Sequence, residues 1–166
     1  MAEMRALSLI RPWGSLILAD HPRAKRTENR GWDTNYRGWF VLHHGQKWDE
    51  SSHRLARDRR LPDLISWRLD DHAPGLVGVA RLEAVCSRRL NDKYADCDCD
   101  EWAMPGQRHW RLAAKVYAFP EVIPCPGKQG WWTVPPDKAG AVSEQMAAVR
   151  AARGAEALAE QIGVLT

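Results

Sequence analysis

The sequence predicts an α+β fold, in which helices surround a small, mostly antiparallel sheet that could close as a barrel. Two observations predict it: short apolar segments rich in β-branched residues recur along the first 136 residues, and residues 137–166 are rich in alanine. With 166 residues, the chain has the length of one domain and can bury a core of its own.

The first third of the chain predicts three strands and two helices. Its expected strands cover residues 4–10, which end before Pro12, residues 26–30, and the apolar run of residues 38–44. Apolar residues at helical spacing predict a short helix over 13–19. A second helix is expected over 49–61, with Asp49 or Ser51 as its cap and Leu55 as its buried contact.

The rest of the chain predicts three more strands and a helical tail. Residues 74–86 are typical of a central strand, residues 109–119 alternate like a half-buried strand, and residues 130–134 form a last strand. Residues 87–108 are expected to be a polar loop. A helix should run from Asp137 to about Arg153, with Gly154 breaking it before a final short helix. We therefore expect a domain over residues 1–136 and a helical extension over 137–166 packed on it.

Composition restricts where the protein works and what it contacts. No segment approaches the roughly 18 consecutive apolar residues of a membrane span, and the N-terminus lacks the apolar core of a signal peptide. We expect a cytoplasmic protein without a membrane partner, whose four cysteines are reduced thiols.

Positive charge is concentrated in two segments. Residues 1–60 carry 12 Lys and Arg against 7 Asp and Glu, and residues 103–136 carry 4 against 1. If the fold joins these segments, they form one face that attracts polyanions; otherwise they are solvated surface charges. Several of the nine tryptophans lie among these cations, where their rings could stack on bases or simply fill a core.

Two ordered motifs in the first 48 residues resemble the ASCH domain family. That family reads roughly L-S-x-R-Q-P-W-A-x-L-I-L, then K-x-x-E-x-R-x-W-x-T-x-Y-R-G, then a strand ending I-H-A. The matching residues are Leu7, Ser8, Pro12, Trp13, Leu16, Ile17, Leu18, Lys25, Glu28, Arg30, Trp32, Thr34, Tyr36, Arg37, Gly38 and His43. Two later segments, GLVGVARLEAV and PCPGKQGWWTV, are similar to its middle and closing strands, so the resemblance spans residues 5–135.

The resemblance implies a PUA-like β-barrel with a cleft where Lys25, Glu28 and Arg30 meet the Gly-Lys-Gln-Gly segment. Domains of this class are associated with RNA or DNA, and several hold a modified base in a pocket. The family includes an amidohydrolase that acts on N4-acetylcytidine, and ribonuclease activity has been reported in it. The ligand-binding residues we expect are Trp13, Arg30, Trp32, Tyr36, Arg37, His43, Lys128, Gln129 and Trp131.

The chemistry of Lys25 and Glu28 can also be argued from the residues themselves. Three apart on one strand they would face opposite sides of the sheet, so they converge only if Lys25 lies in the turn before the strand. A lysine beside a carboxylate can shuttle protons or act as a nucleophile, or it can form an ordinary salt bridge at the rim of a cleft. Arg30 is the better candidate for a phosphate or base edge because its guanidinium donates two parallel hydrogen bonds.

Other polar clusters predict less. Cys97, Cys99 and His109, with Cys86 as a further ligand, suggest a metal site, but C-x-C spacing alone is not a zinc signature. We therefore expect a solvated acidic loop over residues 92–101, no metal and no cofactor. Of the adjacent His43 and His44, one should face inward and one outward.

Two functions remain from this reading. The first is a module that binds nucleic acid or a modified nucleobase, RNA more than DNA. The second is a hydrolase, either an N4-acetylcytidine-type amidohydrolase or a ribonuclease, with Lys25 and Glu28 as its acid–base pair and Lys128 or backbone amides holding the oxyanion. A third possibility is a partner-binding domain whose cleft has lost its ligand.

Overall fold

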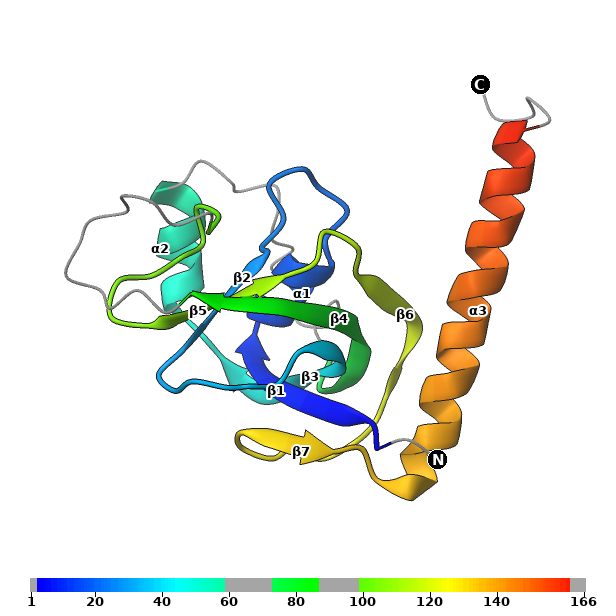
Figure 1. The fold of residues 1–166 in the computed structure, drawn as a ribbon, viewed down its shortest axis with the longest axis horizontal. Helices are drawn as coiled ribbons and strands as arrows, with labels where there is room; N and C mark the ends of the chain where they lie inside the picture. The colour runs from blue at the N-terminus through cyan, green and yellow to red at the C-terminus, as the bar shows by residue number, and fades with distance from the viewer. Residues whose placement is uncertain (1–2, 59–72, 87–98, 162–166) are drawn as a thin grey trace.

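A computed structural model describes residues 3–58, 73–86 and 99–161 of the chain (Figure 1). These residues form an α+β fold of one mixed sheet with three helices. In chain order the elements are β1 (Arg5–Arg11), α1 (Trp13–Leu18), β2 (Thr27–Arg30), β3 (Gly38–Trp48), α2 (Ser51–Asp58), β4 (Gly75–Cys86), β5 (Arg108–Leu112), β6 (Tyr117–Ile123), β7 (Trp131–Thr133) and α3 (Pro136–Gln161).

The sheet is mostly antiparallel, as the sequence predicts. Its strand order is β2-β5-β4-β3-β1-β7, and β6 pairs with β4. Only β1 and β3 run parallel among the described pairs, because the chain crosses through α1 and β2 between them. Strand β4 is 12 residues long, so β6 and β5 pair with successive parts of its edge opposite β3.

The prediction of one strand over residues 109–119 is wrong. Residues 113–116 interrupt it, and the two halves pair with β4 at different places: Leu112 lies opposite Leu82, and Tyr117 lies opposite Val79. Ala114 is exposed although Trp110 and Leu112 on the same predicted face are buried. Apolar residues alternate through residues 113–116 as well, so the sequence shows no sign that the strand is interrupted there.

The sheet is not closed into a barrel by backbone hydrogen bonds between the described strands. Its end strands, β2 and β7, are only four and three residues long. Side chains bridge the gap instead: the ring of Trp110 on β5 stacks on that of Trp131 on β7, with centroids 5.3 Å apart. The guanidinium of Arg30 on β2 also donates a hydrogen bond to the Ser8 carbonyl on β1, at 2.9 Å. The sheet is therefore curved enough for its two ends to meet through side chains.

Each face of the sheet has its own core, because successive side chains of a strand point to opposite faces. On β3, Phe40 and Leu42 belong to the core inside the curve, and Val41 belongs to the core on the other face. That outer core is completed by β6 and by Val142 of α3. The inner core also contains Trp110 and Leu112 of β5 and Ile17 of α1.

The C-terminal helix α3 runs unbroken from Pro136 to Gln161, so the predicted break at Gly154 is wrong. A single glycine within a helix costs only about 1 kcal/mol, too little to end a helix without a proline nearby. Figure 1 shows α3 alongside β6. The side-chain oxygen of Gln145 accepts a hydrogen bond from the Glu121 amide, at 3.1 Å.

Candidate functional site

The site is organised around Glu28, whose two carboxylate oxygens contact two different cations. Oε2 pairs with the ammonium of Lys25, and Oε1 lies 3.1 Å from Nε of Arg30. Lys25 precedes β2, which is the position that allows its side chain to converge with that of Glu28. Glu28 and Arg30 are two residues apart on β2 and therefore share a face of the strand.

The Lys25–Glu28 pair lies deeper than the cleft rim at which the sequence placed it. Lys25 is 1% exposed and Glu28 is 6% exposed. Burying a charged group is expensive unless an opposite charge and hydrogen bonds accompany it. The pair is therefore part of the packed interior as well as of the site, which changes what a substitution there will do.

Arg30 joins this pair to the strands around it. Besides Nε against Glu28, its Nη2 donates to the Ser8 carbonyl at 2.9 Å, and its guanidinium lies over the ring of Trp110, 5.9 Å from the centroid. Of these contacts only the one from Nη2 is a hydrogen bond, since Nε is within ion-pair distance of Glu28 without a hydrogen bond of its own. None of these contacts uses Nη1, and the Arg30 side chain is 17% exposed.

A cleft of about 260 Å³ opens over these three side chains. Its volume is just below the range of about 300–1,000 Å³ that is typical of small-molecule sites, which suits a single base or nucleoside. Its walls come from β1, α1, β2, the start of α2 and the segment before β5. The lining residues are Ser8, Leu9, Ile10, Trp13, Lys25, Glu28, Asn29, Arg30, Asp49, Ser51, Met104 and Gln107.

Asp49 and Trp13 form one wall of the cleft. The indole N–H of Trp13 donates to Oδ2 of Asp49 at 2.9 Å, and Oδ1 accepts from the amide and hydroxyl of Ser51. Burial raises the pKa of Asp49, but the hydrogen bonds from Ser51 and Trp13 outweigh it and hold the pKa below its ordinary value. Asp49 thus caps α2 and presents a fixed negative charge at the cleft.

The opposite wall is fastened by Asn29. Its side-chain N–H donates to the carbonyl of Trp102, and its side-chain oxygen accepts from the amide of Met104, both at 2.9 Å. These bonds attach the segment before β5 to β2 and place Met104 and Gln107 at the cleft. Asn29 has no distinctive motif, so its role follows only from the structure.

Seven of the nine predicted ligand-binding residues do not line the cleft and have structural or exposed positions. Trp32, Tyr36 and Trp131 pack on the inner core. The Trp32 and Trp110 rings meet edge to face at 4.6 Å, and Trp131 donates its indole N–H to the Thr34 hydroxyl at 2.9 Å. Lys128 and Gln129 are exposed. The core interpretation of these rings is therefore favoured over base stacking, and the cleft receives no contact from the Gly-Lys-Gln-Gly segment.

Tyr36 and Arg37 also serve local structure. The Tyr36 hydroxyl donates to the Trp39 carbonyl, and burial raises the Tyr36 pKa while Arg5 opposes that shift. Arg37 is exposed, and its guanidinium donates to the Thr34 carbonyl at 3.0 Å. Neither residue lines the cleft.

The prediction that one of His43 and His44 faces outward is wrong, because both are buried. The register shift between β3 and β4 adds its extra residue to β4, so the two histidines still point to opposite faces of β3. His43 lies against the ring of Trp132 on one face, and His44 lies against Gly14 of α1 on the other, so both faces are covered. Nε2 of His43 forms a hydrogen bond with the Cys125 carbonyl at 2.9 Å. Burial lowers the pKa of His43, and this hydrogen bond opposes the shift.

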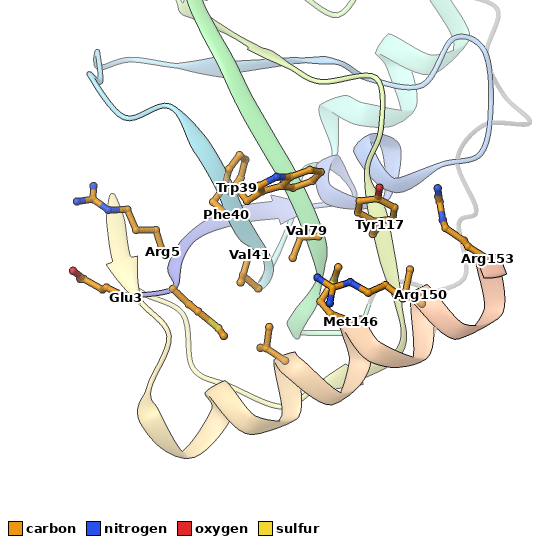
Figure 2. A pocket seen from close by; sticks show the side chains of 13 residues that line it. Glu3, Arg5, Trp39, Phe40, Val41, Val79, Tyr117, Met146, Arg150 and Arg153 are labelled. Carbon is orange, nitrogen blue, oxygen red and sulfur yellow. The ribbon is translucent and has the colours of Figure 1, made fainter. Parts of the chain in front are cut away.

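A second, larger cavity of about 760 Å³ lies between the sheet and α3 (Figure 2). Its walls are mainly apolar, from β3, β4 and α3, and the side chains of Arg5, Arg150 and Arg153 lie around it (Figure 2). The exposed ring of Trp39 lies beside that of Tyr117, with centroids 5.6 Å apart. No predicted site residue lines this cavity.

Comparison with known proteins identifies no family for this chain. No model of a known family matches the chain, and no curated protein is significantly similar to it. Among the described residues, no helix is both long and apolar enough to cross a bilayer. The site chemistry of Lys25, Glu28 and Arg30 must therefore be interpreted from its own geometry.

Proposed function

We propose that the cleft over Glu28 binds a nucleobase or a modified nucleoside, in RNA more than in DNA, within a PUA-like domain of the ASCH type. The observation that carries the proposal is the fixed guanidinium of Arg30 at the floor of a cleft of single-base size. Its Glu28 and Ser8 contacts hold one edge of the fork, so the other edge meets a ligand without further ordering.

The charge of the cleft favours a base rather than a phosphate inside it. Its lining contains two cations, Lys25 and Arg30, and two anions, Glu28 and Asp49, which balance. A nucleobase is neutral and offers donors and acceptors at its edges, which suits such a lining.

The surroundings of the cleft favour a nucleotide over a free base. Strand β2 pairs with β5 so that Arg30 lies directly opposite Arg108, on the same face. This pairing joins parts of the two basic segments of the sequence. We expect phosphates next to a bound base to lie along this pair of arginines, beside the cleft that Arg30 lines.

Hydrolysis is a second candidate function, and the buried contact between Lys25 and Glu28 favours it. In a deacylation, Glu28 would take a proton from water as the oxygen attacks the acyl carbon. The ammonium of Lys25 would then give a proton to the departing nitrogen as the C–N bond breaks, and it would be reprotonated by Glu28. Lys128 does not line the cleft, so Arg30 replaces it as the proposed partner of the oxyanion.

A binding and turnover assay tests the proposal. The protein is incubated with a panel of nucleosides, including cytidine and N4-acetylcytidine, and with short RNA and DNA strands of one sequence. Binding is measured by calorimetry and products by mass spectrometry. We expect saturable binding of at least one nucleoside, tighter binding of RNA than of DNA, and a salt dependence confined to the strands. The absence of binding and turnover across the panel would contradict both candidate functions.

Variants distinguish the two functions. If the protein only binds, neither the parent nor Lys25→Met forms a product, and the substitution changes only the affinity for the nucleoside. If it is a hydrolase, the same change lowers turnover by a factor of about 100 or more, as expected for a lost general acid or base, while substrate still binds.

A further inference from the structure

Three metal-ligating side chains meet at the edge of the sheet outside the cleft. Cys86, Cys99 and His109 each offer one donor atom, and these atoms all lie within 4.8 Å of one another. All three residues are half-buried, and neither thiol is part of a disulfide. Two thiols and an imidazole in this arrangement are unusual as a chance cluster on a protein surface.

The fold brings the three ligands together from distant parts of the chain. Cys86 ends β4 and His109 is near the start of β5, and the two residues lie directly opposite each other in that antiparallel pair. Cys99 reaches the same place from the segment before β5. The sequence suggests these residues as a metal site but predicts no metal, because C-x-C spacing is not a zinc signature. Strand pairing adds the proximity of Cys86 and His109, which the spacing does not show.

The position of Cys99 is fixed by its neighbour Asp100. The Asp100 amide donates to the Thr27 hydroxyl at 3.2 Å, and its side-chain oxygens accept from the amides of Arg26 and Trp102. The chain therefore holds Cys99 against β2 through bonds that do not involve the thiol itself.

His109 has the hydrogen bond that a metal ligand requires. Its Nε2 lies 2.8 Å from the Met104 carbonyl, which can only accept, so Nε2 carries the proton. The lone pair of the neutral ring is then on Nδ1. A ligating histidine usually donates its other N–H to a carbonyl or carboxylate, which fixes the ring orientation and the tautomer.

We propose that Cys86, Cys99 and His109 bind one Zn²⁺ ion. Two thiolates with an imidazole select zinc among the common divalent cations, because hard cations such as Mg²⁺ and Ca²⁺ prefer oxygen. Zn–S and Zn–N bonds of about 2.3 and 2.0 Å require donor atoms roughly 3.5–3.8 Å apart in a tetrahedron. The donors here lie within 4.8 Å of one another and need to approach by about 1.3 Å at most. The fourth position is open to water or to a donor outside the described residues; Cys97 lies outside them.

The bound ion would stabilise the segment that walls the cleft. The segment runs from Cys99 to His109 in β5, so the ion would join its two ends. It would also join both ends to Cys86, the last residue of the neighbouring strand β4. Met104 and Gln107 of the segment line the cleft. The site is therefore structural in its proposed role, closing a loop that backbone pairing alone does not close.

Zinc content tests the proposal directly. The protein is produced without a histidine tag in zinc-supplemented medium, passed through a desalting column, and analysed by mass spectrometry for metal per chain. We expect about one zinc per chain in the parent protein. Cys99→Ser and His109→Ala each leave two of the three ligands, and loss of even an outer-shell partner weakens metal affinity about 10–100-fold. Both variants should therefore retain much less than one zinc per chain after desalting.

The controls are matched by residue type. Cys125→Ser removes a thiol that is outside the cluster, and His21→Ala removes an exposed imidazole, so both should keep the zinc. His109→Cys should also keep it, because three thiolates form a good zinc site. Equal zinc content in Cys99→Ser, His109→Ala and the parent would overturn the proposal.

A second measurement covers variants that fail to fold. The parent protein, stripped with a chelator and loaded with Co²⁺, should show thiolate-to-cobalt charge transfer and the visible absorption of a tetrahedral site. Absence of these bands overturns the proposal. So does an intact mass lower by two hydrogens with Cys86 joined to Cys99, because that result would identify the thiols as a disulfide pair.

Discussion

The ammonium of Lys25 lies in direct contact with Oε2 of Glu28, and both side chains are buried. Arg30 holds the other oxygen of the same carboxylate. Glu28 thus has two roles: it neutralises a buried lysine, and it orients the arginine that faces the cleft.

Glu28→Gln should destabilise the protein strongly. The change leaves Lys25 buried without a charged partner, and breaking a buried pair in this way costs about 3–5 kcal/mol. The free energy of unfolding, measured by urea denaturation, should fall by that amount. Glu101→Gln is the matched control: it breaks the exposed pair of Glu101 with Arg23, which solvent screens, and it should have little effect. Equal stability of the two variants would show that Lys25 is not buried as described.

Trp131→Leu should reduce stability without changing ligand affinity. The Trp131 ring stacks on Trp110 and packs edge to face on Phe40, inside the curve of the sheet. Truncating a fully buried tryptophan to alanine costs about 3–5 kcal/mol. Trp131 is partly buried and leucine keeps part of its packing, so we expect a smaller loss. Trp39→Leu removes an exposed ring and serves as the control. A loss of nucleoside affinity in Trp131→Leu at unchanged stability would instead support its predicted stacking role.

Two glycines should respond in opposite directions to alanine. A Cβ at Gly14 of α1 would overlap the buried ring of His44, whereas a Cβ at Gly140 of α3 meets nothing within 4 Å. Gly14→Ala should therefore lower the thermal midpoint. Gly140→Ala should raise stability by roughly 0.8–1 kcal/mol through helix propensity. If Gly14→Ala is as stable as the parent, the packing of α1 on β3 is looser than described.

The free energy of unfolding should decrease as the pH falls below 6.5, and His43 should contribute to this decrease. Burial lowers the folded-state pKa of His43 below 6.5, its ordinary value. Between that lowered pKa and 6.5 the unfolded chain binds a proton that the folded protein does not, so stability is lost as pH falls through this window. Unfolding from about pH 7.5 to about pH 5 should show this slope, and His43→Gln should reduce it. The exposed His21 provides the control: His21→Gln should keep the slope of the parent.

How much of this could be predicted from the sequence differs between the fold and the site. Strands β1, β3, β4 and β7 could be predicted because each is a short apolar segment bounded by a glycine or a proline. Such a local pattern is enough to determine a strand. The curve of the sheet depends instead on rings such as Trp110 and Trp131, which are 21 residues apart in the sequence. The buried position of both His43 and His44 depends on distant segments, because Trp132 covers one face of β3 there and α1 covers the other.

The site was predicted only in part for the same reason. Lys25, Glu28 and Arg30 are close in sequence, so their convergence could be argued from strand geometry. Asp49 and Met104 reach the cleft from other elements, and no local pattern identifies them as its walls. Their contribution depends on contacts between distant segments.

The central claim is that Arg30 contacts the ligand in the cleft. The most direct test is the affinity of the tightest-binding nucleoside for the parent, Arg30→Ala and Arg37→Ala, measured by calorimetry on folded protein. Arg37 is exposed and outside the cleft, so it controls for loss of a positive charge. We expect Arg30→Ala to weaken binding by about 1–3 kcal/mol, the value of a bidentate arginine contact, and Arg37→Ala to bind like the parent. Equal affinity of the parent and Arg30→Ala would contradict the claim.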